Sequence, residues 1–242
     1  MNGKIKVALC LSGETRSSMF CFPYIYESFL QKNDLYEVDI YIHSWKNFRA
    51  LPLYDYKNHM IDYSSEDQIY LNYYKKFKDL DKDLYPYVKN LHNLPIKNTI
   101  LMYYGIGNCF ELTKEKKYDF YIRCRLDVLF NEKFDLGYVL QHLQTTKKDI
   151  WVRHNYEIDK HRVPEINDQF AICNYKAIKA YSNTYFNIPK LIQQTESYVP
   201  EGLLYQQLIN NNITIERGIA EWSLVRKVNP ITFPFNKTFL DQ

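Results

Sequence analysis

The segment from Lys4 to Leu30 places the strongest constraint on the fold. Residues 4–11 form a continuous, β-rich and apolar run, which is typical of a strand covered on both faces of a sheet. Ser12 and Gly13 end this run, and residues 17–30 have the pattern of a helix. A buried strand followed directly by a helix is the repeating unit of α/β proteins, so the chain is predicted to belong to that class.

Strands and helices go on alternating along the rest of the chain. Further strands are predicted over residues 38–43, 119–125, 149–153, 169–173 and 213–216, and helices over residues 98–116, 136–143, 175–185 and 202–210. Residues 46–95 are polar, rich in tyrosine and interrupted by prolines, so we expect a long connection with one or two short helices. We predict a single domain over residues 1–242, with a Rossmann-type, mostly parallel central sheet flanked by helices.

The composition favours a folded protein without a nucleic-acid partner. Hydrophobic residues make up 46% of the chain, which argues against global disorder. The net charge of +3 comes from 31 Lys and Arg residues against 28 Asp and Glu residues, and these are dispersed along the chain. Nucleic-acid-binding domains usually concentrate positive charge on one face, so no nucleic acid is expected as a partner.

The N-terminal apolar run and the cysteines bear on the location of the protein. The run from Ile5 to Leu11 is too short for a signal-peptide core with a cleavage site or for a bilayer span. We therefore expect no transmembrane segment and a cytoplasmic location. The five cysteines are odd in number and widely spaced, which predicts reduced core thiols rather than disulfides or a zinc site; they are Cys10, Cys21, Cys109, Cys124 and Cys173.

Polar residues gather where the predicted strands end. In a parallel sheet the carboxyl ends of the strands meet at one edge, and ligands bind there. Ser12 to Arg16 follows the first strand, His43 to Trp45 ends the second, Arg125 to Asp127 ends the central strand, and Asp168 precedes a later strand. We expect these residues to form the functional site.

The central stretch YDFYIRCRLDVLF, residues 118–130, carries ions in an apolar run. If the strand stays extended, the spacing puts Arg123, Arg125 and Asp127 on one side of the sheet. A carboxylate flanked by arginines can hold a divalent cation beside phosphate oxygens. The alternative is an internal salt bridge that ties the strand to the following loop.

The loop SGETR, residues 12–16, offers backbone N–H groups and the Arg16 guanidinium to a diphosphate. The alternative is that Ser12 or Thr15 caps a helix and that Arg16 is solvated. The chain contains neither a GxGxxG nor a GxxxxGK[ST] motif, which argues against a dinucleotide oxidoreductase and a P-loop kinase.

Five segments follow one another in a recognisable order: VALCLSGETRS, VDIYIHSW, YDFYIRCRLDVLF, NDQFAICNYKAIKAY and EGLLYQQLINNNI. Together, across residues 5 to 217, they resemble a family of small glycosyltransferases with the GT-A fold, found in surface-polysaccharide gene sets and in large DNA viruses. The resemblance implies transfer of a sugar, of hexosyl or deoxyhexosyl type, from a nucleotide diphosphate sugar to a hydroxyl of a glycan, with a UDP-sugar favoured. We expect residues 1–127 to form the donor half and residues 128–242 the acceptor half.

The sequence departs from the usual Asp-x-Asp metal motif of such enzymes, which appears as Arg125-Leu126-Asp127. The resemblance implies that Asp127 ligates Mn²⁺ or Mg²⁺ together with the donor diphosphate. With one carboxylate left, Arg125 could instead replace part of the charge of the metal. Metal dependence therefore stays open.

Glycosyl transfer needs cations near the leaving diphosphate and, for inversion, a carboxylate base near the acceptor hydroxyl. Arg16, Arg123 and Arg125 are candidates for the first task. Asp168 and Glu201 are candidates for the second, although Asp168 could cap a turn and Glu201 is an ordinary first-turn helix residue. His43 and Trp45 could contact the nucleotide base or ribose, but core packing explains Trp45 equally well.

Two functions from other classes also fit the sequence. A non-catalytic module could hold a polysaccharide or single-stranded nucleic acid on its aromatic residues, and Asp127 and Asp168 would then be dispensable for binding. A hydrolase could use the same carboxylates on a phosphorylated or glycosidic substrate, and water would then be its only acceptor.

Overall fold

The computed structural model describes residues 3–14, 17–30, 34–45, 59–65, 68–69, 94–131, 134–153, 166–197 and 199–225. Its helices are α1 (Ser18–Ile25), which continues into the π-helical turn η1 (Tyr26–Leu30), α4 (Leu94–Glu111), α5 (Leu136–Thr146), α6 (Tyr175–Ser182), α7 (Thr184–Thr195) and α8 (Pro200–Asn210). Its strands are β1 (Ile5–Ser12), β2 (Tyr36–Trp45), β3 (His59–Ser64), β4 (Phe120–Arg125), β5 (Val128–Phe130), β6 (Ile150–Arg153), β7 (Phe170–Cys173), β8 (Ile215–Gly218) and β9 (Trp222–Leu224).

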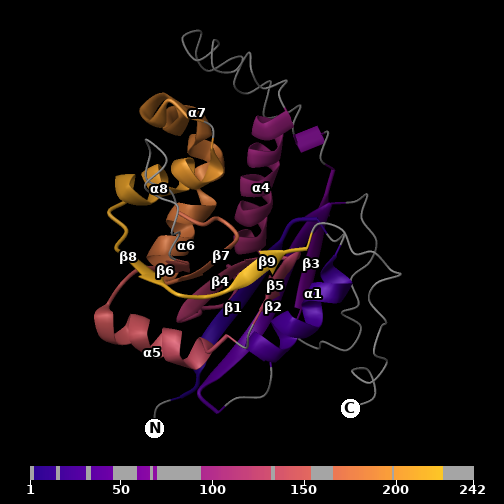
Figure 1. The fold of residues 1–242 in the computed structure, drawn as a ribbon, viewed down its shortest axis with the longest axis vertical. Coiled ribbons are helices and arrows are strands. Elements are labelled where there is room, and N and C mark those ends of the chain that lie inside the picture. Colours follow the sequence, from indigo (N-terminus) through magenta and orange to yellow (C-terminus); the bar gives the residue numbers. More distant parts are fainter. Residues whose placement is uncertain are drawn as a thin grey trace.

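Seven strands form the central sheet, in the order β3-β2-β1-β4-β7-β6-β8 (Figure 1). Neighbouring strands are parallel except where β7 pairs with β4 and with β6. The predicted fold class, a mostly parallel central sheet flanked by helices in one domain, is confirmed.

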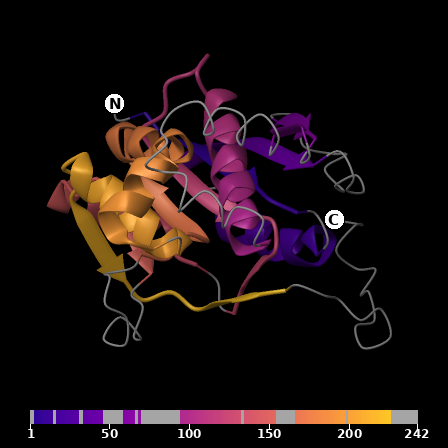
Figure 2. The same cartoon turned by 90° about the horizontal axis from the view of Figure 1, so that it is seen from above.

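Helices cover both faces of the sheet and bury two hydrophobic clusters. The side chains of β1 alternate between them: Val7 and Leu9 join the cluster under α1 and α5, whereas Ala8 and Cys10 join the cluster under α4, α6 and α8. Figure 2 shows α4, in magenta, beside the orange and yellow helices of the second group. Burial of a large apolar side chain contributes about 1.5–3 kcal/mol, so both clusters hold the sheet in place.

Local sequence explains where several helices begin and end. Asp135 caps α5 and Asn174 caps α6, each by accepting a 2.9 Å hydrogen bond from the backbone three residues further on. The sequence predicts one helix over residues 175–185, whereas the structure has two, α6 and α7, which meet at Asn183. Asparagine is a poor helix former because its side chain competes for backbone hydrogen bonds, which favours the break there.

Three short strands are missing from the sequence-based prediction. β3 lies inside residues 46–95, so the expectation of a connection with short helices is wrong for residues 59–64; most of that stretch lies outside the described residues. β5 and β9 pair in a separate antiparallel ribbon of three residues each. Their partners are far apart in the sequence, so no local pattern marks them.

Two simpler predictions concern the cysteines and the membrane. All five cysteines are buried and free, which confirms the prediction of reduced core thiols. Within the part of the chain that the structure describes, no helix has both the length and the apolar character needed to cross a bilayer.

Candidate functional site

Three strands end side by side at the carboxyl edge of the sheet. Ser12, at the end of β1, lies opposite His43 of β2 on one side and Arg125 of β4 on the other. Side chains along a strand alternate between the two faces of the sheet. Each of these three residues lies an even number of positions from a residue of its own strand that packs under α4, so all three side chains lie on the α4 face. The parallel pairing of the strands therefore brings these three residues, which were predicted from the sequence, together at one edge.

The loop after β1 begins with a conformation that favours glycine. Gly13 has a φ angle of 131°, which other residues rarely adopt. Its N–H donates to the carbonyl of His43 at 3.3 Å, and its own carbonyl accepts from the Ser44 hydroxyl at 2.9 Å. These bonds fix the start of the loop against β2. Arg16, a predicted diphosphate ligand, lies outside the described residues.

Arg123 is a buried cation beneath this edge, with 1% of its surface exposed. Its Nη1 donates to the carbonyl of Ser12 at 3.4 Å and to that of Cys124. Its Nε has no hydrogen-bond partner among the described residues. Because carbonyl oxygens compensate a guanidinium charge only in part, Arg123 gives the edge a fixed positive charge.

Arg125 and Asp127 form a bidentate ion pair. Nε of Arg125 donates to one carboxylate oxygen at 2.7 Å and Nη2 donates to the other at 2.8 Å. The Asp127 side chain is 3% exposed, whereas the Arg125 side chain is 23% exposed. Burial acts to lower the pKa of Arg125, but the bonds to Asp127 together with the charges of Asp127, Asp168 and Glu14 outweigh it, so the pKa is raised. The salt bridge considered from the sequence is present.

The extended geometry assumed for this stretch does not hold through Asp127. β4 ends at Arg125, and the chain turns at Leu126 and Asp127 instead of continuing the strand. Leu126 is buried in the cluster on the opposite face of the sheet, which anchors the turn. Asp127 therefore folds back onto Arg125 and does not occupy the next position along the strand.

The turn is tied to a distant part of the chain through the β5–β9 ribbon. The Val225 N–H donates to the Asp127 carbonyl at 2.9 Å, and the Val225 carbonyl accepts a hydrogen bond from the Ser17 hydroxyl. Nε1 of Trp222 donates to Oε1 of Gln169 at 3.0 Å. These bonds join the end of β4, the start of α1 and the residue before β7.

Asp168 lies at the same edge, two residues before β7, and is 4% exposed. The backbone N–H of Arg125 donates to the carbonyl of Gln169, the residue after Asp168, at 3.0 Å. This bond sets Asp168 beside the end of β4. Burial raises the pKa of Asp168; Arg125 and Arg123 oppose this, and Asp127 adds to it. A buried carboxyl group with a raised pKa is suited to accept a proton.

The turn before β7 is held by Asn167, whose Oδ1 accepts from the Gln169 N–H at 2.9 Å. Among the described residues, no side chain donates a hydrogen bond to the Asp168 carboxylate. The Asp168 carboxylate therefore accepts none of the side-chain hydrogen bonds that hold this turn.

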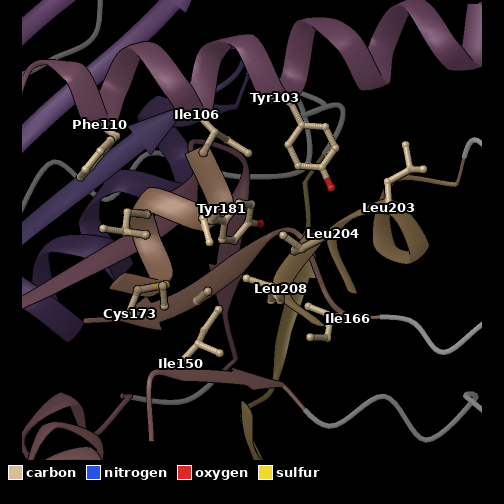
Figure 3. Close-up of a cluster of buried hydrophobic side chains, with 14 of the residues drawn as sticks. Tyr103, Ile106, Phe110, Ile150, Ile166, Cys173, Tyr181, Leu203, Leu204 and Leu208 are labelled. Carbon is tan, nitrogen blue, oxygen red and sulfur yellow. The ribbon is translucent and has the colours of Figure 1, made fainter. Parts of the chain in front are cut away.

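Sequence reasoning missed two tyrosines that support this region. Tyr181 of α6 donates its hydroxyl to the backbone carbonyl of Asp168 at 2.8 Å, and Tyr103 of α4 donates to that of Pro200 at 2.7 Å. Figure 3 shows both rings in the hydrophobic cluster beside Leu204. The chain has 23 tyrosines, and no local pattern separates these two from the rest.

Glu201 belongs to the same neighbourhood through α8. It is partly buried in the first turn of that helix, and its backbone carbonyl accepts from the Ile166 N–H at 3.2 Å. Burial raises the pKa of Tyr103 well above its usual value, and the charges of Asp168 and Glu201 add to this effect. Glu201 therefore holds the segment before Asp168, and its role as a base stays a prediction.

His43 and Trp45 are buried under α4, at 0% and 4% exposure. Nε2 of His43 bonds to the Ser64 hydroxyl at 3.0 Å, and burial lowers the pKa of His43 to about 4, against the opposing charge of Asp62. Trp45 stacks on Tyr104 with ring centroids 6.2 Å apart. Core packing accounts for Trp45 in this structure, and a contact of either side chain with a nucleotide stays a prediction.

The close packing of α4 over His43 depends on a glycine. A Cβ atom at Gly105 would lie 3.2 Å from Nδ1 of His43 and 3.8 Å from Cβ of Ser12. Nδ1 itself has no hydrogen-bond partner among the described residues. Gly105 lets the helix backbone cover the carboxyl end of β1 and β2 directly.

The residues present do not fit the divalent cation that the resemblance implies. Both carboxylate oxygens of Asp127 accept hydrogen bonds from Arg125. The described residues contain no group of three His, Cys, Asp or Glu side chains that could hold a metal ion. A cation at Asp127 would have to reach a carboxylate that is 3% exposed and lies beside the positive charge of the Arg125 guanidinium.

No protein-family model and no curated protein sequence matches the chain. Among solved structures, it is similar to the apo form of mouse xyloside xylosyltransferase 1, with a TM-score of 0.45 and 11% identity over 89% of this chain and 84% of that one. It is also similar to a glycosyltransferase involved in the glycosylation of the major capsid of PBCV-1, with a TM-score of 0.47 and 9% identity over 88% of this chain and 82% of that one.

A third solved structure is that of CMP:2-keto-3-deoxy-manno-octonic acid synthetase complexed with CTP, with a TM-score of 0.46 and 11% identity over 93% of this chain and 94% of that one. With identities of 9 to 11% and TM-scores of 0.45 to 0.47, these similarities assign the chain to no family and give it neither a donor nor an acceptor.

Proposed function

We propose that this chain is a glycosyltransferase that moves a sugar, of hexosyl or deoxyhexosyl type, from a nucleotide diphosphate sugar to a hydroxyl group of a glycan. UDP-sugars are the favoured donors. The observation that carries the proposal is the cluster where β1, β4 and β7 meet: the cations Arg123 and Arg125 lie beside the buried carboxyl group of Asp168.

The arginines suit the departing diphosphate. When the bond between the anomeric carbon and the diphosphate oxygen breaks, negative charge grows on the diphosphate and positive charge on the sugar ring. Arg125 reaches the surface at 23% exposure, close to the backbone of the loop that begins at Gly13. Arg123 adds a buried positive charge behind it. Charge-assisted bonds from Arg125 to phosphate oxygens would stabilise the leaving group.

Asp168 suits the acceptor. The acceptor hydroxyl forms the new bond to the anomeric carbon and must lose its proton, which in an inverting reaction passes to a carboxylate. Burial raises the pKa of Asp168, which makes it a stronger base than an exposed aspartate. Glu201, in the first turn of α8, is the alternative base.

The proposal assigns donor binding to residues 1–127 and acceptor binding to residues 128–242. Arg123 and Arg125 belong to the first part, and Asp168 and Glu201 belong to the second. The division falls at the turn that ends β4.

Thermal stability of the purified chain against nucleotide diphosphates and their sugars tests the proposal, because a ligand that binds only the native state raises the melting temperature. We expect stabilisation by one nucleotide family, and glycan-dependent release of that nucleotide diphosphate with addition of one sugar mass to the glycan. Release with water as the only acceptor would identify a hydrolase. Stabilisation by glycans alone would identify a non-catalytic binding module.

A further inference from the structure

The two members of the Arg125–Asp127 pair differ in what they offer to a ligand. The carboxylate is 3% exposed and the guanidinium is 23% exposed, so a solute that reaches this edge meets Arg125 first. The Asp127 backbone is also held from behind, since its carbonyl accepts from Val225 at 2.9 Å. The carboxylate is therefore fixed beneath the guanidinium.

The hydrogen-bonding capacity of the pair is uneven as well. A divalent cation such as Mn²⁺ or Mg²⁺ requires oxygen ligands that it can reach, whereas the Asp127 carboxylate is 3% exposed and each of its oxygens accepts a bond from Arg125, at 2.7 and 2.8 Å. A guanidinium has five N–H donors in one plane, and Asp127 takes two of them. The other three make no hydrogen bond to a described residue, although the charges of Asp168 and Glu14 also act on the guanidinium.

We infer that Arg125, rather than a divalent cation held by Asp127, binds the diphosphate of the donor, and that Asp127 is the positioning residue that orients the guanidinium. This inference rests on the proposed function, because it concerns the donor of that reaction. The negative charges of Asp127, Asp168 and Glu14 weaken the attraction of Arg125 for an anion. The fixed orientation compensates, since a planar guanidinium that is already held loses less entropy when it bonds to phosphate.

Calorimetric titration with UDP, in EDTA and in Mn²⁺, tests this assignment. If another nucleotide diphosphate gives the larger thermal shift, that nucleotide replaces UDP. We expect equal affinity in the two buffers. Arg125→Gln removes charge-assisted bonds and should weaken binding by about 10- to 100-fold in both. Lys117→Gln is the matched control: it removes one positive charge from an exposed residue just before β4, at the opposite edge of the sheet, and should leave the affinity unchanged.

The role of Asp127 is read from a double-mutant cycle. If Asp127 acts through Arg125, Asp127→Asn should weaken UDP binding in both buffers, and the double variant should bind no worse than Arg125→Gln alone. If Asp127 is a metal ligand, Mn²⁺ should strengthen binding to the wild type but not to Asp127→Asn, and the losses in the double variant should add. That result overturns the inference.

Arg125→Lys keeps the charge but loses the bidentate geometry, so it serves where the Asp127 variants unfold. Weaker UDP binding by Arg125→Lys in EDTA supports the inference, and unchanged binding contradicts it. Binding of nucleotide diphosphates that occurs only with Mn²⁺ overturns the inference and leaves the proposed function standing. Absence of binding in both buffers overturns both.

Discussion

Two buried aspartates at opposite edges of the sheet have opposite ionisation behaviour. Asp149 precedes β6 and Asp168 precedes β7, and these strands are antiparallel neighbours, so the two residues lie at opposite ends of the pair. Their exposures are similar, 8% for Asp149 and 4% for Asp168. Yet the pKa of Asp149 is lowered, whereas that of Asp168 is raised.

The difference lies in the donors around each carboxylate. Asp149 accepts from Asn174 at 2.8 Å, from Lys176 at 3.1 Å, and from the N–H and hydroxyl of Thr214 at 2.8 and 2.9 Å. Burial acts to raise its pKa, but these bonds outweigh burial. Asp168 has charged neighbours without such bonds among the described side chains. The hydrogen-bond donors around Asp149, which the Asp168 carboxylate lacks among the described side chains, therefore separate a structural carboxylate from one that can take up a proton.

The largest effect is expected at Asp168. Asp168→Asn should lower the rate of sugar transfer by about 10²- to 10⁴-fold, since the proposed general base is lost. In the wild type, the acid limb of the pH–rate profile should lie above the pKa of an exposed aspartate, because burial raises the pKa of Asp168.

Stability separates the Asp168 variant from a misfolded one. An ionised carboxyl group whose pKa is raised in the folded state costs stability at pH values above its unfolded pKa, so Asp168→Asn should be at least as stable as the wild type at neutral pH. If Asp168→Asn were destabilised but fully active, Asp168 would be a structural residue, contrary to the contrast drawn here with Asp149.

Asp149 should show the opposite profile. Asp149→Ala should lower the free energy of unfolding by roughly 4 kcal/mol, because four hydrogen bonds to the carboxylate are lost at about 1 kcal/mol each. Urea denaturation measures the loss. Nucleotide affinity of the folded variant should match the wild type, and a large drop in that affinity would contradict the division into structural and functional edges.

The comparison of buried ionisable groups extends to a basic side chain, that of His43. Its pKa is about 4 in the folded chain because of burial, against 6.5 unfolded, so the unfolded chain takes up a proton that the folded chain excludes. Stability should fall by about 3 kcal/mol as the pH falls from 6.5 to 4. Urea denaturation across this range should show a smaller loss for His43→Gln than for the wild type. An unchanged slope in His43→Gln would assign the loss to other groups.

The smallest effect concerns the hydroxyl groups behind the site. Tyr181→Phe removes the 2.8 Å bond to the Asp168 carbonyl and should cost about 1 kcal/mol of stability. Tyr103→Phe, which removes the 2.7 Å bond to Pro200, should cost a similar amount. Only the Tyr181 variant should shift the acid limb of the pH–rate profile, because only it loosens the backbone of Asp168; equal shifts in both would contradict this.

The sequence predicted the elements whose signal is local. The apolar run that forms β1 and the strand–helix alternation identify the sheet, because side-chain periodicity depends only on near neighbours. β5 and β9 escaped prediction because their pairing joins Val128 to Leu224, and three-residue strands carry no periodicity. The break at Asn183 escaped because both flanking helices have similar patterns.

For the candidate site too, the sequence predicted only what local patterns and the fold class determine. Ser12 and Arg125 end two neighbouring parallel strands, and His43 lies beside Ser12 near the end of a third, so their meeting at one edge follows from the fold class. The ion pair of Arg125 with Asp127 depends on a turn that the strand pattern does not reveal. The bond from Tyr181 to the residue 13 positions earlier depends on helix packing, which no local pattern encodes.

The β5–β9 ribbon also sets an order of assembly. The turn at Asp127 is closed by Val225, 98 residues later, so a chain emerging from the ribosome can form β1, β2 and β4 well before this edge is complete. Contacts of such long sequence separation form late because the intervening chain must first lose entropy. A nascent chain that has not reached residue 225 can therefore form these strands of the sheet, but it still lacks the hydrogen bond that closes the turn at Asp127.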